Sequence, residues 1–134
     1  MKFVHIAFCA VVFVLAIGAF GQTSPGDLVV DVPFAFSANG HKLPAGHYTV
    51  TQKIDMIRIF NRKNTGLYVP TMFALRTRTD GSKLVFHRYG NDYFLSAVWM
   101  TGSKSGKELF PSRAEREAKA KRAEMEIAVV RPAQ

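Results

Sequence analysis

The chain has little of what several classes of enzyme require. Its 134 residues include one cysteine, Cys9, and its 10 acidic residues are outnumbered by 18 Lys and Arg. It contains no glycine-rich phosphate loop and no dinucleotide-binding motif. No apolar run after residue 20 is long enough to span a bilayer. If the segment that holds Cys9 is removed, the rest of the chain has no thiol for a disulfide, a nucleophile or a metal site, and its stability must come from packing.

The amino terminus is typical of a secretory signal peptide. One lysine precedes an apolar run from Phe3 to Phe20, and the small residues Ala19 and Gly21 have the spacing of a cleavage site. We therefore expect residues 1–21 to be a signal peptide that is cleaved after Gly21, and the protein to be periplasmic or extracellular. The alternative is an uncleaved membrane anchor, because the run almost matches a hydrocarbon core of about 30 Å.

The formal net charge of +8 attracts anionic partners through its long-range field. The basic residues are dispersed along the chain, however, and in the carboxy-terminal part they alternate with glutamates. A solvated surface that keeps the protein soluble is the main interpretation. Electrostatic attachment to an anionic polymer or a membrane surface is an alternative. Export argues against nucleic acid as a partner.

Residues 28–100 are rich in β-branched and aromatic residues and are cut by turn signals such as Asn39-Gly40 and Gly90-Asn91. Residues 30, 32, 34 and 36 are apolar and alternate with smaller or polar residues, which indicates a strand with one buried face. Pro33 lacks an amide hydrogen, so this strand belongs at an edge. The pattern predicts an all-β fold over residues 22–101: a single antiparallel β-sandwich or small barrel of about seven or eight strands.

Residues 84–100 read as a hairpin around Gly90 and Asn91. A two-residue loop would place His87 opposite Phe94, whereas a three-residue loop would place it opposite Leu95. Both faces of this hairpin carry bulky apolar groups in either register. A strand pair that is apolar on both faces needs a cover on both faces. The opposing sheet can provide one cover, and a carboxy-terminal helix, a long loop or another subunit can provide the other.

The composition changes after Met100. Residues 102–111 are polar and glycine-containing, which predicts a flexible connector. Ser112 and Glu115 then have the spacing of a capping box, which satisfies the first free amides of a helix. We expect one carboxy-terminal α-helix over residues 112–126. Residues 127–134 form either a tail or a short edge strand.

The turn of the predicted hairpin brings flat aromatic rings close to polar side chains. Such a mixture suits binding of sugars, peptides or protein surfaces, because the rings bury area and the polar groups orient the ligand. A packed core beneath a polar turn is the competing interpretation, and Phe94 and Trp99 fit it best. The candidate binding residues are His87, Arg88, Tyr89, Asn91, Asp92 and Tyr93.

The sequence gives little support for catalysis or for a metal. A small hydrolase that uses His87 and Asp92, with Ser96 as the nucleophile, is an alternative function. Neither a nucleophile elbow nor an oxyanion-hole glycine accompanies these residues, so we assign no catalytic residue. His41 and His47 do not have the spacing of a zinc motif with each other or with His87. We expect neither a metal nor a cofactor.

Three segments together resemble a family of short, exported bacterial proteins to which no activity is assigned. They are VDVPFAFSANGHKLPAGHYTV (30–50), LVFHRYGNDYFLSAVWM (84–100) and GKELFPSRAEREA (106–118). The resemblance implies a bacterial, exported protein and carries over no site residue. We therefore expect a noncatalytic β-module that binds a glycan or a protein of the cell envelope or the extracellular space. Association between copies of the chain would be a further mode of interaction.

Overall fold

A computed structural model describes residues 26–121 and 124–132 of the chain. The expected signal peptide at 1–21, its cleavage site and Cys9 lie outside the described residues. Within the described residues the fold is all-β with one helix near the carboxy terminus, which confirms the expected fold class. The single helix in this part of the chain is too short to cross a membrane.

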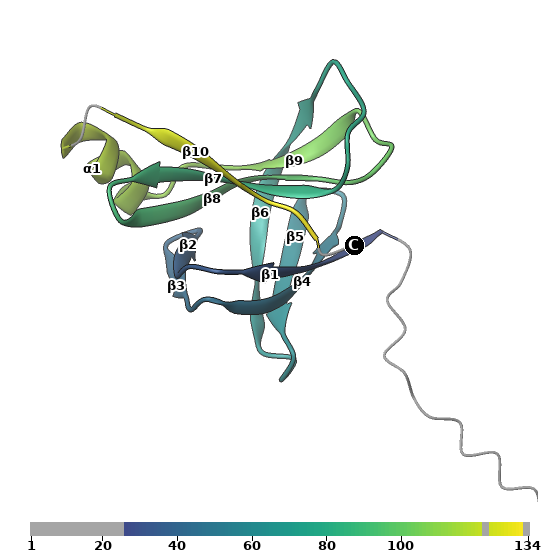
Figure 1. Cartoon of the computed structure of the whole chain (residues 1–134), viewed down its shortest axis with the longest axis horizontal. Helices are drawn as coiled ribbons and strands as arrows, with labels where there is room; N and C mark the ends of the chain where they lie inside the picture. Colours follow the sequence, from purple (N-terminus) through teal and green to yellow (C-terminus); the bar gives the residue numbers. More distant parts are fainter. Residues whose placement is uncertain (1–25, 122–123, 133–134) are drawn as a thin grey trace, which may run out of the picture.

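The described part of the chain forms ten strands and one helix (Figure 1). The strands are β1 (Asp27–Val32), β2 (Phe36–Ala38), β3 (His41–Leu43), β4 (Gly46–Gln52), β5 (Met56–Asn61), β6 (Gly66–Leu75), β7 (Lys83–Tyr89), β8 (Asp92–Trp99), β9 (Ser105–Leu109) and β10 (Glu126–Val130), and the helix is α1 (Arg113–Lys121). The strands number more than seven or eight, partly because the first apolar run divides at residues 33–35 into β1 and β2.

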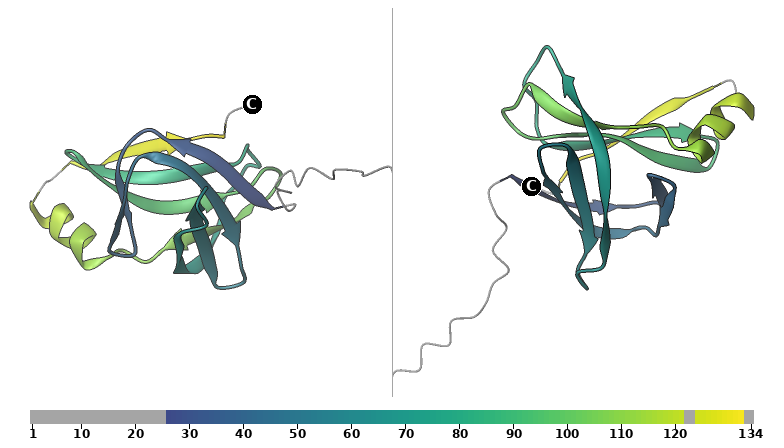
Figure 2. Two further views of the ribbon diagram at one scale, coloured as in Figure 1. Left: turned by 90° about the horizontal axis from the view of Figure 1, so that it is seen from below. Right: turned by 180° about the vertical axis from the view of Figure 1, so that it is seen from behind.

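The long strand β6 belongs to both halves of the fold. Its first half pairs with β5 and its second half with β9, and the change of partner falls between Pro70 and Thr71. Antiparallel pairing runs from β1 through β4 and β5 to β6, then through β9 and β8 to β7 and β10. The end strands β1 and β10 approach each other without pairing. The arrangement is therefore a small barrel with one open seam (Figures 1 and 2).

Alternating side chains from both halves fill one core. The strand face predicted from residues 30–36 is confirmed, because Val30, Val32 and Phe36 are buried and Phe34 packs against them. Phe86 has no exposed surface, and the rings of Phe34 and Phe36 meet it edge-on at centroid distances of 4.9 and 5.3 Å. Burial of one such side chain stabilises the fold by about 1.5–3 kcal/mol. This aromatic cluster is part of the core.

The β7–β8 hairpin has the two-residue loop. His87 pairs with Phe94 and Tyr89 with Asp92, and Gly90 has a φ of +65°. A bulge near Val85 shifts the register, so that Val85 pairs with Ala97 while Phe86 pairs with Leu95. The β2–β3 hairpin turns on Asn39 and Gly40, whose φ angles of 50° and 81° match the turn that this dipeptide favours. β2 then lies parallel to β8, with Ser37 beside Phe94.

Two expectations about the carboxy-terminal part are wrong. Residues 102–111 are not simply a flexible connector, because they contain β9, which is paired on one side with β6 and on the other with β8. The helix does not extend to Glu126, because that residue begins β10. The expected edge strand over Ile127–Val130 is present as β10, which pairs with β7. The strands β6 and β7, which lie on either side of Asp80-Gly81, do not pair with each other.

A cleft between the helix and the β2–β3 hairpin

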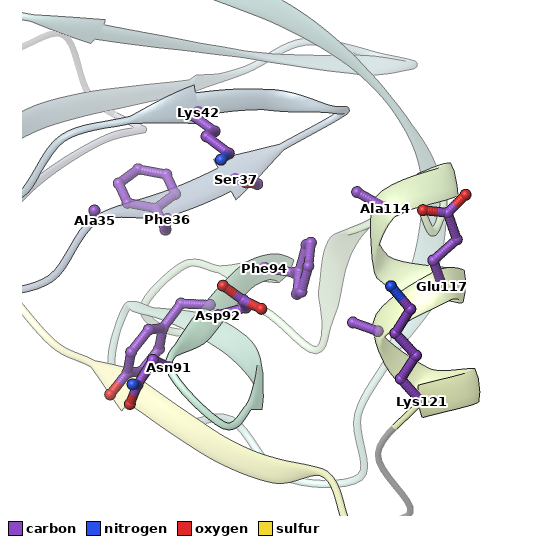
Figure 3. Close-up of a pocket in the computed structure, with 12 residues that line it drawn as sticks. Ala35, Phe36, Ser37, Lys42, Asn91, Asp92, Phe94, Ala114, Glu117 and Lys121 are labelled. Carbon is purple, nitrogen blue, oxygen red and sulfur yellow. The ribbon is translucent and has the colours of Figure 1, made fainter.

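A cleft of about 480 Å³ lies where α1, the β2–β3 hairpin and the β7–β8 turn meet (Figure 3). Its apolar surface comes from Phe36 and Phe94 on the strands and from Ala114 and Ala118 on the helix. Its polar and charged groups are Ser37, Lys42, Asn91, Asp92, Glu117 and Lys121. The volume falls within the range of about 300–1,000 Å³ that small-molecule pockets occupy.

The helix is held in place by its cap and by one buried carboxylate. The amide N–H of Glu115 donates to Ser112 Oγ at 3.2 Å, as the capping spacing predicts. The Glu115 side chain turns toward the sheet, where its Oε1 lies 2.9 Å from His87 Nδ1. Glu115 is only 8% exposed. This hydrogen bond joins α1, which forms one wall of the cleft, to the outer face of β7.

Tyr89 lies next to this contact and is only 3% exposed. Burial raises the pKa of Tyr89 above the ordinary tyrosine value, and the negative charge of Glu115 raises it further. The Tyr89 ring meets Phe94 edge-on at a centroid distance of 5.9 Å. The helix, His87, Tyr89 and Phe94 therefore form a second, smaller packed layer on the outer face of the hairpin. The helix α1 therefore provides the second cover that a hairpin apolar on both faces needs.

The cleft brings together three of the six candidate binding residues, namely Asn91, Asp92 and Tyr93. The other three do not line it. His87 is bonded to Glu115 and Tyr89 is buried. Arg88 donates to the carbonyl oxygen of Gly90 at 2.6 Å and forms an ion pair with Glu126 at 3.5 Å. These three side chains make contacts within the hairpin or with α1 and β10 instead of lining the cleft.

Tyr93 has little free ring surface. Phe34 stacks on it with a centroid distance of 3.8 Å, and the Arg88 guanidinium lies 5.3 Å from the ring centroid. Phe94, which forms part of the cleft surface, is 6% exposed. The aromatic rings near the turn are thus packed against their neighbours. They shape the floor of the cleft but offer no open ring face of the kind that stacks on a sugar.

The structure places His87, Asp92 and Ser96 in different surroundings. His87 Nδ1 is engaged by Glu115, and His87 does not line the cleft that Asp92 lines. Ser96 is 8% exposed and lies at the bulged part of β8. A nucleophile needs its base within hydrogen-bond reach and access for a substrate. No hydrogen bond joins His87 to Asp92 or to Ser96 in the described part of the chain.

The three histidines in the described part of the chain lie in three different surroundings. His41 is exposed on β3, His47 Nδ1 lies 2.7 Å from Asp31 Oδ1, and His87 is paired with Glu115. Across residues 26–121 and 124–132, no three His, Cys, Asp or Glu side chains gather as metal ligands would. The imidazoles are bound locally by single carboxylates or face solvent. Each carboxylate partner fixes the orientation of its ring.

Lys42, Glu117 and Lys121 complete the cleft but are not among the residues expected from the sequence. Figure 3 shows Lys121 extending from α1 along the side that faces Phe94, while Lys42 comes from β3 on the opposite wall. Glu117 is also bound to Arg113 Nε at 3.0 Å. Glu117 and Lys121 have i, i+4 spacing on a helix, so the sequence places them on one face. Only the docking of the helix shows that this face borders the hairpin turn.

No family model, curated protein or solved structure matches the chain.

Proposed function

We propose that the protein is an exported, noncatalytic binding module whose cleft holds a short segment of a partner protein in the cell envelope or outside the cell. The observation that carries the proposal is the cleft itself. It has an apolar floor from two strands and the helix, and charged groups of both signs around its rim. Binding pockets typically combine such an apolar surface with a few polar groups that orient the ligand.

The chemistry of the rim favours a peptide. Lys42 and Lys121 supply two ammonium groups, and Asp92 and Glu117 supply two carboxylates. A peptide segment carries backbone donors and acceptors together with side chains of either charge, so groups of both signs can be used. An anionic polymer would be attracted by the lysines and repelled by the carboxylates, which argues against purely electrostatic attachment at this site.

A sugar fits this cleft less well than a peptide does. Sugar binding commonly uses an accessible ring face, and Tyr89, Tyr93 and Phe94 are buried or stacked on other side chains. An apolar peptide side chain needs only a concave apolar surface. The small residues Ala114 and Ala118 leave room for such a side chain between the helix and Phe94.

The export part of the proposal rests on the sequence. A basic start, an apolar run and the small residues Ala19 and Gly21 support a signal peptide at residues 1–21. An exported module without a thiol suits an oxidising compartment, because it can neither form nor reshuffle a disulfide. In that compartment the available partners are envelope proteins, secreted proteins and surface polymers.

Filling the cleft from the helix side tests the proposal. The full chain is expressed with export and purified from the periplasm, where its mass shows whether it begins at Gln22. A displayed library of random linear peptides is then the probe. We expect the wild type to enrich peptides in which an apolar residue is flanked by charges. Ala118→Trp should abolish the enrichment because its ring occupies the cleft.

Ala120→Trp is the matched control, because Ala120 is exposed on the same helix and does not line the cleft. It should enrich the same peptides as the wild type, and circular dichroism should show that both variants keep the fold. Failure of the wild type to enrich any peptide would overturn the proposal. Equal enrichment by the wild type and Ala118→Trp would place peptide binding elsewhere.

A further inference from the structure

The outer face of the β1–β4–β5–β6 half carries a row of side chains that crosses four strands. Asp27 pairs with Thr51, Thr51 with Arg58, and Arg58 with Tyr68, so these residues are direct neighbours in register. Their neighbours in each strand, such as Val50, Ile57 and Val69, point into the core. The row therefore faces outward. The helix lies at the β7–β8 hairpin and leaves this face uncovered (Figure 2).

Arg58 is held between two aromatic rings. Its guanidinium carbon lies 4.1 Å from the centroid of Phe60 and 5.9 Å from that of Tyr68. Its Nη2 donates to Asn64 Oδ1 at 2.7 Å. Asn64 has a φ of 59° in the β5–β6 turn, where Asn61 accepts bonds from the amides of residues 63 and 65. The guanidinium is thus oriented before any ligand arrives, which reduces the entropy cost of binding.

Tyr68 is 61% exposed although it is a large aromatic residue within the paired part of a strand. It differs in this respect from Tyr89 and Phe94 near the cleft, which are packed. An exposed ring next to a fixed guanidinium offers a flat apolar surface and charged donors side by side. A hollow of about 650 Å³ adjoins the row and is lined in part by Asp27, Thr51, Arg58 and Phe60.

The charges of this region are separated along the face. Residues 56–79 contain five Arg and Lys and no Asp or Glu. Of these cations, Arg62 and Lys63 are exposed in the β5–β6 turn next to Arg58. The acids of the face lie on the far strand β1, where Asp27 accepts a bond from Thr51 at 2.8 Å and Asp31 is paired with His47. The β5–β6 end is therefore cationic, and no described carboxylate pairs with Arg58, Arg62 or Lys63.

We propose that the outer face of β5 and β6 binds an acidic polysaccharide, a chain of sugar rings that carry carboxylates. Tyr68 stacks under one sugar ring, because the apolar face of a pyranose matches an aromatic face. Arg58 donates a charge-assisted pair of hydrogen bonds to a carboxylate of the chain. Arg62 and Lys63 add long-range attraction, and Asp27 and Thr51 supply polar groups for hydroxyls farther along the row.

This site is separate from the cleft in both position and chemistry. The cleft borders α1 and carries charges of both signs. The β5–β6 surface is aromatic and cationic, and it adjoins a hollow lined in part by Arg58 and Phe60. The β5–β6 hairpin projects from the rest of the fold (Figures 1 and 2), so a long polymer can lie across it without meeting the helix. The proposal therefore does not depend on peptide binding in the cleft.

Affinity electrophoresis of the full chain in gels that contain polygalacturonate tests the proposal. We expect the wild type to be retarded in polygalacturonate and not in neutral dextran. Tyr68→Ala should weaken binding by about threefold to tenfold, because it removes one stacking contact. Tyr68→Phe should bind nearly as well as the wild type, because the ring face remains. Arg58→Gln should weaken binding by about tenfold, because a charge-assisted bond is lost.

Matched controls separate this site from general charge and from the cleft. Phe73→Ala removes a ring that is also exposed but lies elsewhere, and Lys42→Gln removes a cation of the cleft. Both should bind polygalacturonate as the wild type does. Binding that all cation variants weaken equally and Tyr68→Ala leaves unchanged would overturn the proposal in favour of nonspecific attraction. Retention on phosphatidylglycerol vesicles but not in polygalacturonate would overturn it in favour of a membrane surface.

Discussion

Two outer faces of the small barrel differ in whether other parts of the chain cover them. One is the outer face of β7, β8 and β9, and the other is that of β4, β5 and β6. The first is covered, by α1 at one end and by the Trp99 ring, which lies over Gly106, at the other. The second is open and carries its polar and aromatic residues in registered rows. The barrel wall needs one apolar face only, so the second apolar face of β7 and β8 requires the helix.

The barrel has one histidine–carboxylate pair on the open face and one on the covered face, and the two pairs differ in their exposure to water. His47 and Asp31 lie 2.7 Å apart on the open face, where the Asp31 side chain is 74% exposed. His87 and Glu115 lie 2.9 Å apart under the helix, where the Glu115 side chain is 10% exposed. The geometry is nearly the same. Water can replace the partner in the first pair but not in the second, so only the second should matter for stability.

The largest effect is expected from adding a methyl group on the covered face. In Gly106→Ala the new Cβ would lie 2.5 Å from the Trp99 ring and 2.8 Å from the Val98 carbonyl oxygen. We expect the free energy of unfolding to fall by about 2–3 kcal/mol, because the ring and strand must move apart. Gly46→Ala in β4 is the control, since its Cβ would meet only the Tyr48 ring at 4.0 Å. Urea unfolding of both variants measures the difference in the free energy of unfolding. Equal stabilities would show that the Trp99 ring is not packed tightly against residue 106.

The next effect comes from removing one carboxylate from each histidine pair. Glu115→Ala should lower the free energy of unfolding by about 1–3 kcal/mol, because His87 loses its partner in a part-buried position. Asp31→Ala should change it by less than about 0.5 kcal/mol. Urea unfolding and the hydrogen exchange of α1 amides are the measurements. If Asp31→Ala were the more destabilising variant, the helix that covers the His87–Glu115 pair would not determine how much each pair contributes to stability.

The smallest effect concerns two buried tyrosines, one in each half. Burial raises the pKa of Tyr48 and of Tyr89 above the ordinary value of 10.0, and Glu115 raises that of Tyr89 further. Because the folded state then holds these protons more tightly than the unfolded state, stability is full below about pH 10 and falls as the pH rises above it. Glu115→Gln should lower the pKa of Tyr89 and leave that of Tyr48 unchanged. Ultraviolet titration of Tyr48→Phe and Tyr89→Phe separates the two, and equal responses to Glu115→Gln would contradict the assignment.

Local signals in the sequence predict the parts of the fold that depend on neighbouring residues. The hairpin over residues 84–100, the turn at Asn39-Gly40 and the cap at Ser112 all follow from residue types a few positions apart. Local signals do not predict the strand β9, because its sequence is polar and contains Gly106. It becomes a strand since it fills the space between β6 and β8, where its amides and carbonyls find partners on both sides. Its glycine is there because Trp99 occupies the space that a side chain would need.

The candidate sites also contain residues that local sequence predicts and residues that only the fold brings together. Asn91, Asp92 and Tyr93 could be chosen from the hairpin alone, because they lie at or directly after its turn. Their partners in the cleft, Lys42 and Lys121, come from segments about 50 residues before and 30 residues after the turn. The row that joins Asp27, Thr51, Arg58 and Tyr68 requires the register of three strand pairs. Register across several strands follows from the packed core and not from any one segment, so this row could not be read from the sequence.

The division of β6 between two partners has a consequence for how the chain assembles. β4, β5 and the first half of β6 are joined by short turns and can pair as soon as they are made. The second half of β6 waits for β9, since Thr71 pairs with Leu109. Until then this edge shows unpaired backbone groups beside Phe73 and Leu75, which remain exposed even in the native fold. A chain that emerges from its amino terminus would therefore show an unpaired, aggregation-prone edge at residues 71–75 until β9 in the last third of the protein has followed.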